Sequence, residues 1–196
     1  AAVERTVDYL LDNTRVLELP LNGRQATELI LLSSAATQAP DGRYNPGSRN
    51  YPTVVILIAG GLTTGVTYQL DGGNHNDSYN NLNLPLPFPD ALQEFKVETS
   101  GLSAQYGFHS EGAVNAVTKS GTNDFHGSAF EFLRNGAINA RNAFDVNNDG
   151  LKRNQFGGTI GGPIIRKKLF FFAGEQRTTE RSRPSANRAY IPTPQI

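Results

Sequence analysis

The stretch GAVNAVTKSGTNDFHGSAFEFLRN, residues 112–135, joins two strands of different character. Its first part, 113–119, alternates β-branched and small residues, which suits a strand in a crowded sheet. The turn formers at 120–124 then require the chain to change direction. In 125–134 aromatic residues alternate with charged ones, a surface that favours a bilayer-facing barrel strand over a hairpin in a soluble domain, although both interpretations remain open.

The sequence after this seam predicts two more strands, 154–164 and 169–178, joined as a hairpin across 166–168. In the first of them, alternation places Phe156, Ile160 and Ile164 on one face, with Gln155 and Thr159 on the other. The second begins with three phenylalanines and turns polar, as a strand does when it leaves a hydrocarbon layer. Three strands cannot close a membrane barrel. Residues 177–196 are interpreted as an extended polar tail.

The sequence before the seam predicts a small α+β unit that ends near residue 121. We expect short helices at 26–32 and 89–94, strands at 53–58, 66–70 and 95–99, and a turn or helical stub at 103–107. Two polar stretches interrupt this pattern. Residues 33–52 are interpreted as a mobile loop, and residues 71–81 as an exposed loop with almost no apolar anchor.

Composition narrows the function classes. Eighteen basic and eighteen acidic side chains cancel, and no basic block stands out, so nucleic acid is not an expected partner. Cysteine is absent, which excludes disulfides and thiolate chemistry in this chain. Its apolar stretches are far shorter than the roughly 20 residues of a membrane helix, whereas β-spans remain allowed. The first two residues are alanines, so we expect a processed or trimmed start.

Two motifs contain the residue types of a chemical site. Asp145, Asn147 and Asp149 match the opening of a calcium loop, but Phe156 stands where the bidentate glutamate belongs. A strand-connecting polar turn is therefore favoured over a weak calcium site, and no cofactor is otherwise expected. Asp71, His75 and Ser78 have the residue types of a hydrolytic trio, yet they lie on one loop without rigid support. We therefore predict a protein that is not an enzyme.

Eight motifs in order resemble the Oar-like TonB-dependent outer-membrane receptors. They are LPLNGR (19–24), YQLDGG with the following HND (68–77), PDALQEFKVETS (89–100), SAQYG (103–107), the seam (112–135), NARNAFD (139–145), RNQFGGTIGGPI (153–164) and LFFFAGEQ (169–176). The resemblance implies a plug-like domain at 1–121, the initial barrel strands at 122–180, and the extended tail at 181–196. It also implies an outer-membrane location, with more barrel strands and a segment that contacts a TonB-type energising protein outside this chain.

The resemblance further implies that a plug binds substrate on its outer loops and gates passage. The polar loop 71–81 is then the best candidate for substrate contact, because its side chains offer many adaptable donors and acceptors. The candidate residues are Asp71, Asn74, His75, Asn76, Asp77, Tyr79 and Asn80. The alternative for each is a solvated loop residue. The substrate could be a chelate, a glycan or a peptide. A second hypothesis is a stand-alone extracellular binding or self-assembling module that pairs its exposed strand edges with neighbouring chains.

Overall fold

A computed structural model describes residues 8–19, 21–39, 54–106, 109, 111–140 and 150–181. The chain separates into two compact units. One comprises Ala1–Phe125 with Gly161–Phe172, and the other comprises His126–Ile160 with Ala173–Ile196. The boundary that the sequence suggests near residue 121 remains a prediction.

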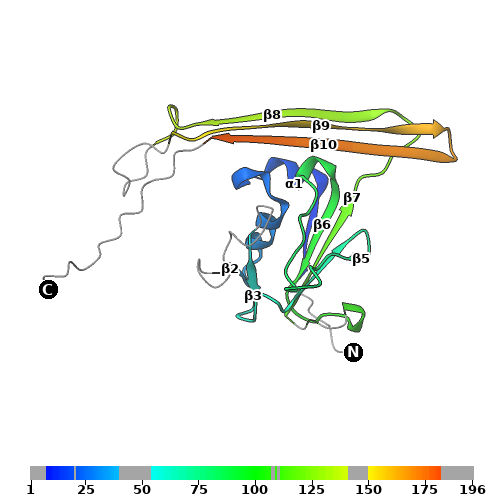
Figure 1. Cartoon of the computed structure of the whole chain (residues 1–196). Helices are drawn as coiled ribbons and strands as arrows, with labels where there is room; N and C mark the ends of the chain where they lie inside the picture. The colour runs from blue at the N-terminus through cyan, green and yellow to red at the C-terminus, as the bar shows by residue number, and fades with distance from the viewer. Residues whose placement is uncertain are drawn as a thin grey trace, which may run out of the picture. The chain divides into compact units, whose positions relative to one another are not determined.

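The first unit is built around a five-stranded sheet in the order β1-β6-β7-β4-β5 (Figure 1). Its strands are β1 (Asp8–Asp12), β4 (Val66–Leu70), β5 (Gly73–Asn74), β6 (Leu92–Glu98) and β7 (Gly112–Thr118). Strands β4 and β7 are parallel, and the other neighbours are antiparallel. The strand expected at 113–119 is therefore the centre of this sheet, which explains its crowded, small-residue sequence.

The core of the first unit lies against this sheet, and its side chains are almost completely buried. Its members have side chains that the sequence places at alternate strand positions or on one side of a short helix. The main ones are Leu11, Val16, Leu29, Ile30, Ile56, Ile58, Val66, Tyr68, Leu92, Phe95, Val97 and Val114. Burying each large apolar side chain stabilises the fold by about 1.5–3 kcal/mol. This unit therefore has a hydrophobic core of its own.

Helices in the first unit are short and mostly of the 3₁₀ type. Among the described residues, the α-helix α1 (Asn13–Glu18) begins after Asp12, whose carboxylate accepts a hydrogen bond from Arg15 N at 3.0 Å. The 3₁₀ segments are η1 (Asn22–Arg24), η2 (Ala26–Leu32), η4 (Pro89–Ala91) and η5 (Ala104–Tyr106). The predictions of helical structure at 26–32 and 103–107 are confirmed, with the tighter 3₁₀ geometry that short runs adopt.

Two sequence expectations for this unit were wrong, and two elements were not expected. The helix expected to continue to residue 94 ends at Ala91, because Leu92 already pairs with β7 as the first residue of β6. Part of the expected loop 33–52 is strand β2 (Ala36–Gln38), which pairs with β3 (Ile56–Ile58). Residues 40–52 lie outside the described residues. Strand β1 and helix α1 carry no clear periodicity in the sequence and were missed.

A buried ion pair joins two distant segments of the first unit. The Arg24 guanidinium donates to the Asp90 carboxylate, and both side chains are about nine-tenths buried. Lys119 lies in the same environment: its backbone N donates to Ala91 O at 2.9 Å, and burial lowers the pKa of its ammonium group while Asp90 opposes that shift. These charges fix the η1 and η4 segments to the end of β7.

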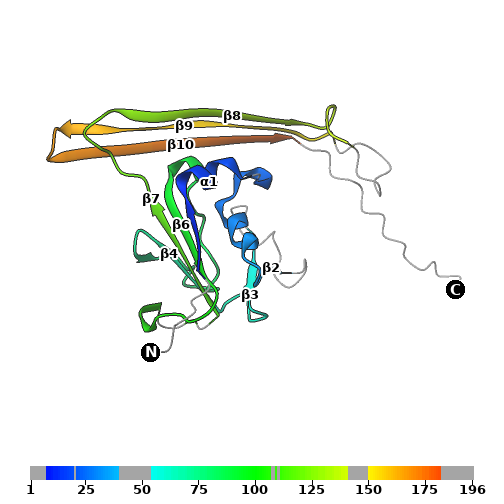
Figure 2. The same ribbon diagram turned by 180° about the vertical axis from the view of Figure 1, so that it is seen from behind.

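The remaining strands form a separate three-stranded sheet in the order β10-β9-β8 (Figures 1 and 2). They are β8 (His126–Asn135), β9 (Lys152–Ile165) and β10 (Leu169–Arg181). The predicted strands and the hairpin across 166–168 are confirmed, and the strands are longer than expected. Residues 177–181, assigned to the tail, continue β10, while residues 182–196 lie outside the described part of the chain.

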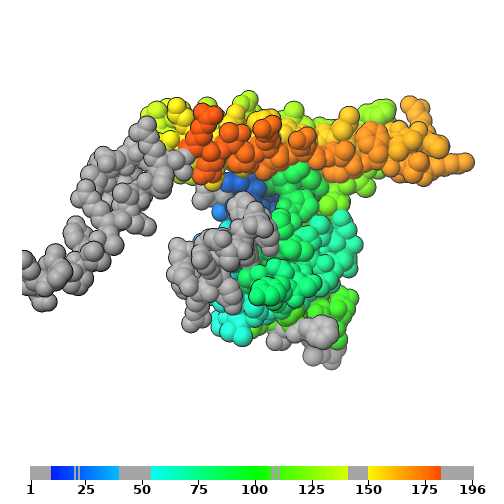
Figure 3. All heavy atoms as spheres, viewed as in Figure 1, coloured from blue at the N-terminus to red at the C-terminus, as the bar shows by residue number. Residues whose placement is uncertain are grey.

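The two faces of this sheet differ as the alternation in β9 predicts. Gln155 and Thr159 are 6% and 8% exposed, and we call their side the polar face. Phe156, Ile160 and Ile164 are 41%, 54% and 62% exposed, and we call their side the apolar face. Figure 3 shows the side chains of β10 open to the viewer along the strand. Exposed aliphatic groups in such a row lack the cover that a soluble sheet would give them.

Candidate functional site

The start of the predicted substrate loop is a structural turn. Asp71 and Gly72 both have positive φ, as a tight hairpin turn between β4 and β5 requires. The Asp71 carboxylate accepts hydrogen bonds from Thr118 N and from Thr118 Oγ1, each at 2.8 Å, and Asp71 N donates to Ala116 O at 3.0 Å. Asp71 therefore ties this turn to the C-terminal end of β7.

Asn76, expected on an exposed loop, is 7% exposed. Its Oδ1 accepts from Tyr68 N at 2.8 Å, and its Nδ2 donates to Val66 O at 2.9 Å and to Asn81 O at 3.1 Å. The expectation that residues 71–81 form an exposed loop was therefore wrong at Asn76. The anchor is an amide rather than an apolar side chain, so hydrophobicity along the sequence could not reveal it.

Around Asn76 the chain folds into a small closed loop, residues 76–83. Asn76 forms an antiparallel bridge with Asn83, and Asp77 N donates to Leu82 O at 2.7 Å. At its apex the Asp77 carboxylate accepts from Tyr79 N at 2.9 Å. These bonds leave the Tyr79 side chain 97% exposed on a closed, well-bonded loop.

A second loop, residues 59–65, lies beside this one. Asn81 Nδ2 donates to Thr64 O at 2.9 Å and lies 3.1 Å from His109 Nε2. Leu62, on the second loop, is 64% exposed. We call residues 59–65, 76–83 and His109 the tip of the first unit. The tip thus combines three chain segments that are separated in the sequence.

Glu111 packs under the second loop. Its backbone N donates to Gly65 O at 3.3 Å, and its carboxylate lies so close to Gly61 and Gly65 that neither position has room for a Cβ atom. Glu111 Oε2 is buried without a hydrogen-bond partner among the described residues. Sequence reasoning gave Glu111 and His109 no role, because only the folded chain brings them to the tip.

The segment that leads to His109 is anchored through Tyr106. Its phenol donates to Glu98 Oε1 at 3.0 Å, and Thr67 Oγ1 donates to Tyr106 O at 3.3 Å. Lys96 Nζ lies 2.5 Å from the same Glu98 oxygen. Burial raises the pKa of Tyr106, and the hydrogen bond to Glu98 raises it further. The anchor therefore keeps the phenol protonated as a donor over a wide pH range.

Three further candidates, Asn74, His75 and Asn80, form side-chain hydrogen bonds with nearby backbone groups. Asn74 Oδ1 accepts from Asn76 N at 3.1 Å, and Asn80 Oδ1 accepts from Leu82 N at 3.0 Å. His75 Nε2 lies 2.9 Å from Pro85 O, so that nitrogen carries a hydrogen in this arrangement.

Of the seven sequence candidates, one lies at the C-terminal end of β4 and four lie at its N-terminal end. Asp71 lies at the C-terminal end of β4, whereas Asn76 is bonded beside Val66 at its N-terminal end. The five residues of β4 span about 15 Å at the usual strand rise. Asp77, Tyr79 and Asn80 lie with Asn76 at the tip end, and Tyr79 is the one whose side chain is almost fully exposed.

No cluster of three or more His, Asp or Glu side chains suited to a metal ion occurs among the described residues. The candidate calcium residues Asp145, Asn147 and Asp149 lie outside them. Within the described ranges, no helix is long and apolar enough to cross a membrane. The structure thus adds no support for a resident cofactor.

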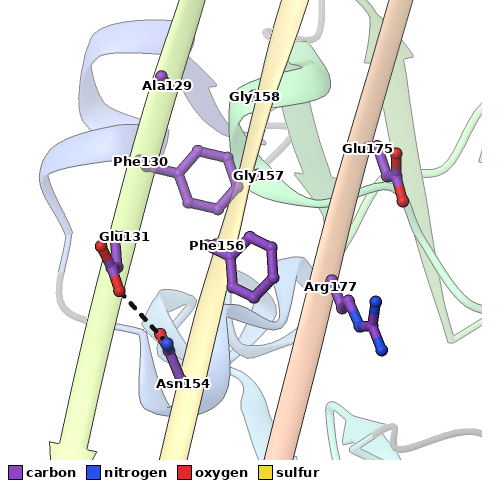
Figure 4. Close-up of a pocket in the computed structure, with 9 residues that line it drawn as sticks. All are labelled: Ala129, Phe130, Glu131, Asn154, Phe156, Gly157, Gly158, Glu175 and Arg177. Carbon is purple, nitrogen blue, oxygen red and sulfur yellow. Dashed lines mark hydrogen bonds between the residues drawn. The ribbon is translucent and has the colours of Figure 1, made fainter.

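A shallow pocket lies on the three-stranded sheet (Figure 4). Its polar lining comes from all three strands: Glu131 of β8, Asn154 of β9, and Glu175 and Arg177 of β10. Asn154 Nδ2 donates to Glu131 Oε1 at 3.3 Å, while Asn154 Oδ1 is buried without a partner among the described residues. Phe156 forms part of the pocket beside them.

Comparison with known proteins gives concordant results. Residues 117–196 match the model of the "Outer membrane beta barrel domain" family. The chain is 33% identical over 138 residues to the TonB-dependent transporter Oar of Myxococcus xanthus, an alignment that covers 66% of this chain and 13% of that protein. The chain therefore spans a small part of the length of this curated relative.

Solved structures share the fold at low sequence identity. The siderophore receptor PirA from Acinetobacter baumannii superposes with a TM-score of 0.66 at 16% identity, covering 90% of this chain and 25% of that one. The outer membrane transporter YddB from Escherichia coli gives a TM-score of 0.65 at 12% identity, covering 88% and 26%. These findings confirm the resemblance to TonB-dependent receptors, the plug-and-barrel fold class and the predicted outer-membrane location.

Proposed function

We propose that this chain supplies the plug, which binds substrate and gates passage, and the first barrel strands of a TonB-dependent outer-membrane transporter, without enzymatic activity. The observation that carries the proposal is the tip. Asn76 and Asn81 hold two loops together, and the exposed Tyr79 and Leu62 project from a framework fixed by hydrogen bonds. Pre-ordered loops that carry exposed aromatic and amide groups suit ligand contact, because little conformational entropy is lost on binding.

Within this proposal the candidate residues have different roles. Tyr79 and Asp77 contact substrate directly, with Asn74, His75 and Asn80 at the margin of the same loop. Asn76 and Asp71 position the loop from its two ends. The substrate is an extracellular solute, and the siderophore named for PirA is one class among those the tip could bind.

The second sheet supports the barrel part of the proposal. Among the described residues, β8 and β10 each have one edge that pairs with no other strand. Unpaired backbone groups in a bilayer cost several kcal/mol each, so these edges require further strands. We propose that the remaining barrel strands supply them and that a TonB-type protein supplies energy through a segment outside this chain.

The experiment uses the full-length protein in intact cells. Tyr79→Cys is introduced into a background without other accessible thiols, and cells are treated with a membrane-impermeant maleimide. We expect rapid labelling at residue 79, because the tip faces the cell exterior and the side chain is exposed. The matched control is Asp71→Cys, at the other end of β4, which we expect to be labelled only after the outer membrane is permeabilised.

Gating is tested with the same two variants in cells that lack the TonB-type protein. We expect residue 79 to be labelled equally with and without it, whereas in permeabilised cells residue 71 should be labelled at a different rate when it is present. Labelling of residue 71 on intact cells, or protection of residue 79, would refute the proposed orientation.

A further inference from the structure

A row of polar side chains crosses the five-stranded sheet on the face opposite its core. In the pairing register, Asn115 of β7 lies between Lys96 of β6 and Gln69 of β4. The residues before and after Asn115, Val114 and Ala116, are 1% and 0% exposed in the core. Because side chains alternate between the two faces of a strand, Asn115 points away from the core, as do Lys96 and Gln69. We call these three residues the polar row and their side of the sheet the second face.

The polar row is only partly covered by the rest of the first unit. All three residues are half-buried, and the Lys96 side chain is 29% exposed. Asn115 Oδ1 is nevertheless buried and has no hydrogen-bond partner among the described residues. An amide oxygen in that state gains a hydrogen bond when water or a hydrophilic solute reaches it. Entry of water at this row is therefore favourable.

The core face of the same sheet has the opposite character. Strands β2 and β3 lie on that side (Figures 1 and 2), and the core that they help to enclose is apolar. Opening that face would expose large side chains such as Phe95 and Tyr68, which are 0% and 2% exposed. Opening the second face exposes groups to which water can hydrogen-bond. The sheet can therefore admit water along the polar row far more easily than along its core.

The polar row also lies between the two ends of the first unit. Asn76, at the tip, donates to Val66 O at the N-terminal end of β4. Asp71 follows the C-terminal end of the same strand and is bonded to Thr118. Gln69 lies on β4 between these two ends. A solute that moves from the tip toward the seam along the second face therefore has to pass the polar row.

We propose that Lys96, Asn115 and Gln69 line the passage that opens when the plug is gated, and that they contact a hydrophilic solute there. This inference rests on the proposed transporter function. Asn115 Oδ1 accepts a hydrogen bond from a hydroxyl or amide of the solute, and Gln69 supplies a second amide beside it. Lys96 Nζ lies 2.5 Å from Glu98 Oε1, so its charge is compensated within the sheet.

The test uses the full-length protein in intact cells, which receive a small hydrophilic methanethiosulfonate reagent. Asn115→Cys is compared with Ala116→Cys in cells with and without the TonB-type protein. Ala116→Cys is the matched control, because it is the next residue on the same strand and faces the core. A passage that is a minor state at rest and a major state during gating should raise labelling of residue 115 about tenfold when the TonB-type protein is present. Residue 116 should stay unlabelled in both strains.

The role of the amide is tested at the neighbouring position of the row. Gln69→Cys is labelled in proteins that also carry Asn115→Leu or Asn115→Asp, two changes close to asparagine in size that differ in polarity. We expect Asn115→Leu to reduce labelling of residue 69 to the level of cells without the TonB-type protein, and Asn115→Asp to retain it. In a separate protein that carries Ala116→Cys, Asn115→Leu should not lower stability in urea, because it removes an unpaired acceptor.

Four results would overturn the proposal: labelling of residue 115 that does not respond to the TonB-type protein, equal labelling of residue 116, unchanged labelling of residue 69 in Asn115→Leu, or a loss of urea stability in that variant. Maleimide labelling of Tyr79→Cys from the cell exterior does not depend on the polar row. If residue 79 is labelled as expected and residue 115 is not, the passage lies elsewhere while the transporter function stands.

Discussion

The two sheets of this chain differ in how far their apolar side chains are buried. In the five-stranded sheet, Phe95 and Val97 are fully buried by the unit's own helices and strands. In the three-stranded sheet, Ile160 and Ile164 are more than half exposed. The first sheet is stabilised from within the chain, whereas the second leaves apolar side chains exposed among the described residues. This contrast explains how one sequence holds two strand patterns that meet at residues 119–125.

The sharpest test of the contrast compares Phe95→Ala with Ile160→Ala. We expect Phe95→Ala to destabilise the first unit by about 3–5 kcal/mol, because it leaves a cavity in a closed core. Ile160→Ala should leave that unit unchanged. The measurement is thiol labelling of an Ala116→Cys reporter, fully buried in β7, in the full-length protein under increasing urea. Equal effects of the two variants would show that the first sheet is not self-sufficient.

Removing an ion pair should likewise cost more stability in the first unit than in the second sheet. Asp90→Asn removes the carboxylate that pairs with the buried Arg24, and we expect a loss of about 3–5 kcal/mol from the first unit. The exposed Arg153–Glu180 pair of the second sheet should contribute at most about 1 kcal/mol. The Ala116→Cys reporter measures the first effect. The second is measured as the heat stability of the full-length barrel carrying Glu180→Gln.

Within the first unit, a comparison of Asn76→Ala with Tyr79→Ala should distinguish a residue that positions the loop from one that contacts the ligand. Removing the buried amide leaves Val66 O and Tyr68 N without their partner, at a cost of about 1–3 kcal/mol. We expect faster hydrogen exchange of residues 59–65 and 76–83 in Asn76→Ala. Tyr79→Ala, which removes only an exposed ring, should leave that exchange unchanged. If hydrogen exchange stays slow in Asn76→Ala, Asn76 does not position these loops.

The smallest expected effect concerns Lys119. Burial lowers its pKa below the usual 10.5, so the unfolded chain binds more protons than the folded chain between the two values. Below both pKa values the buried ammonium lowers the stability of the first unit by a constant amount. Stability should therefore rise with pH through that interval, as the folded chain loses this charge. Lys119→Met should remove this rise relative to the original protein, as read by the same reporter. A rise that persists in Lys119→Met would assign it to another group.

Strand patterns were largely predictable from local sequence. The strand Val66–Leu70, the second strand of the seam and the two strands after it follow from alternation and turn residues, because side-chain direction in a strand repeats every two residues. Strand β1 and β2 were not predictable, because each is defined by pairing with a distant partner rather than by its own pattern. Leu92 became a strand residue for the same reason.

The sequence by itself determined the kinds of strand, the turn across 166–168, the resemblance to TonB-dependent receptors and a polar loop suited to contact. Only the tertiary structure decided which loop residues act together. It assigned Asp71 to a turn and Asn76 to the interior, and it brought Asn81, Thr64 and His109 to one tip. The physical reason is that hydrogen bonds between side chains and a distant backbone depend on pairing in space, which no local periodicity records.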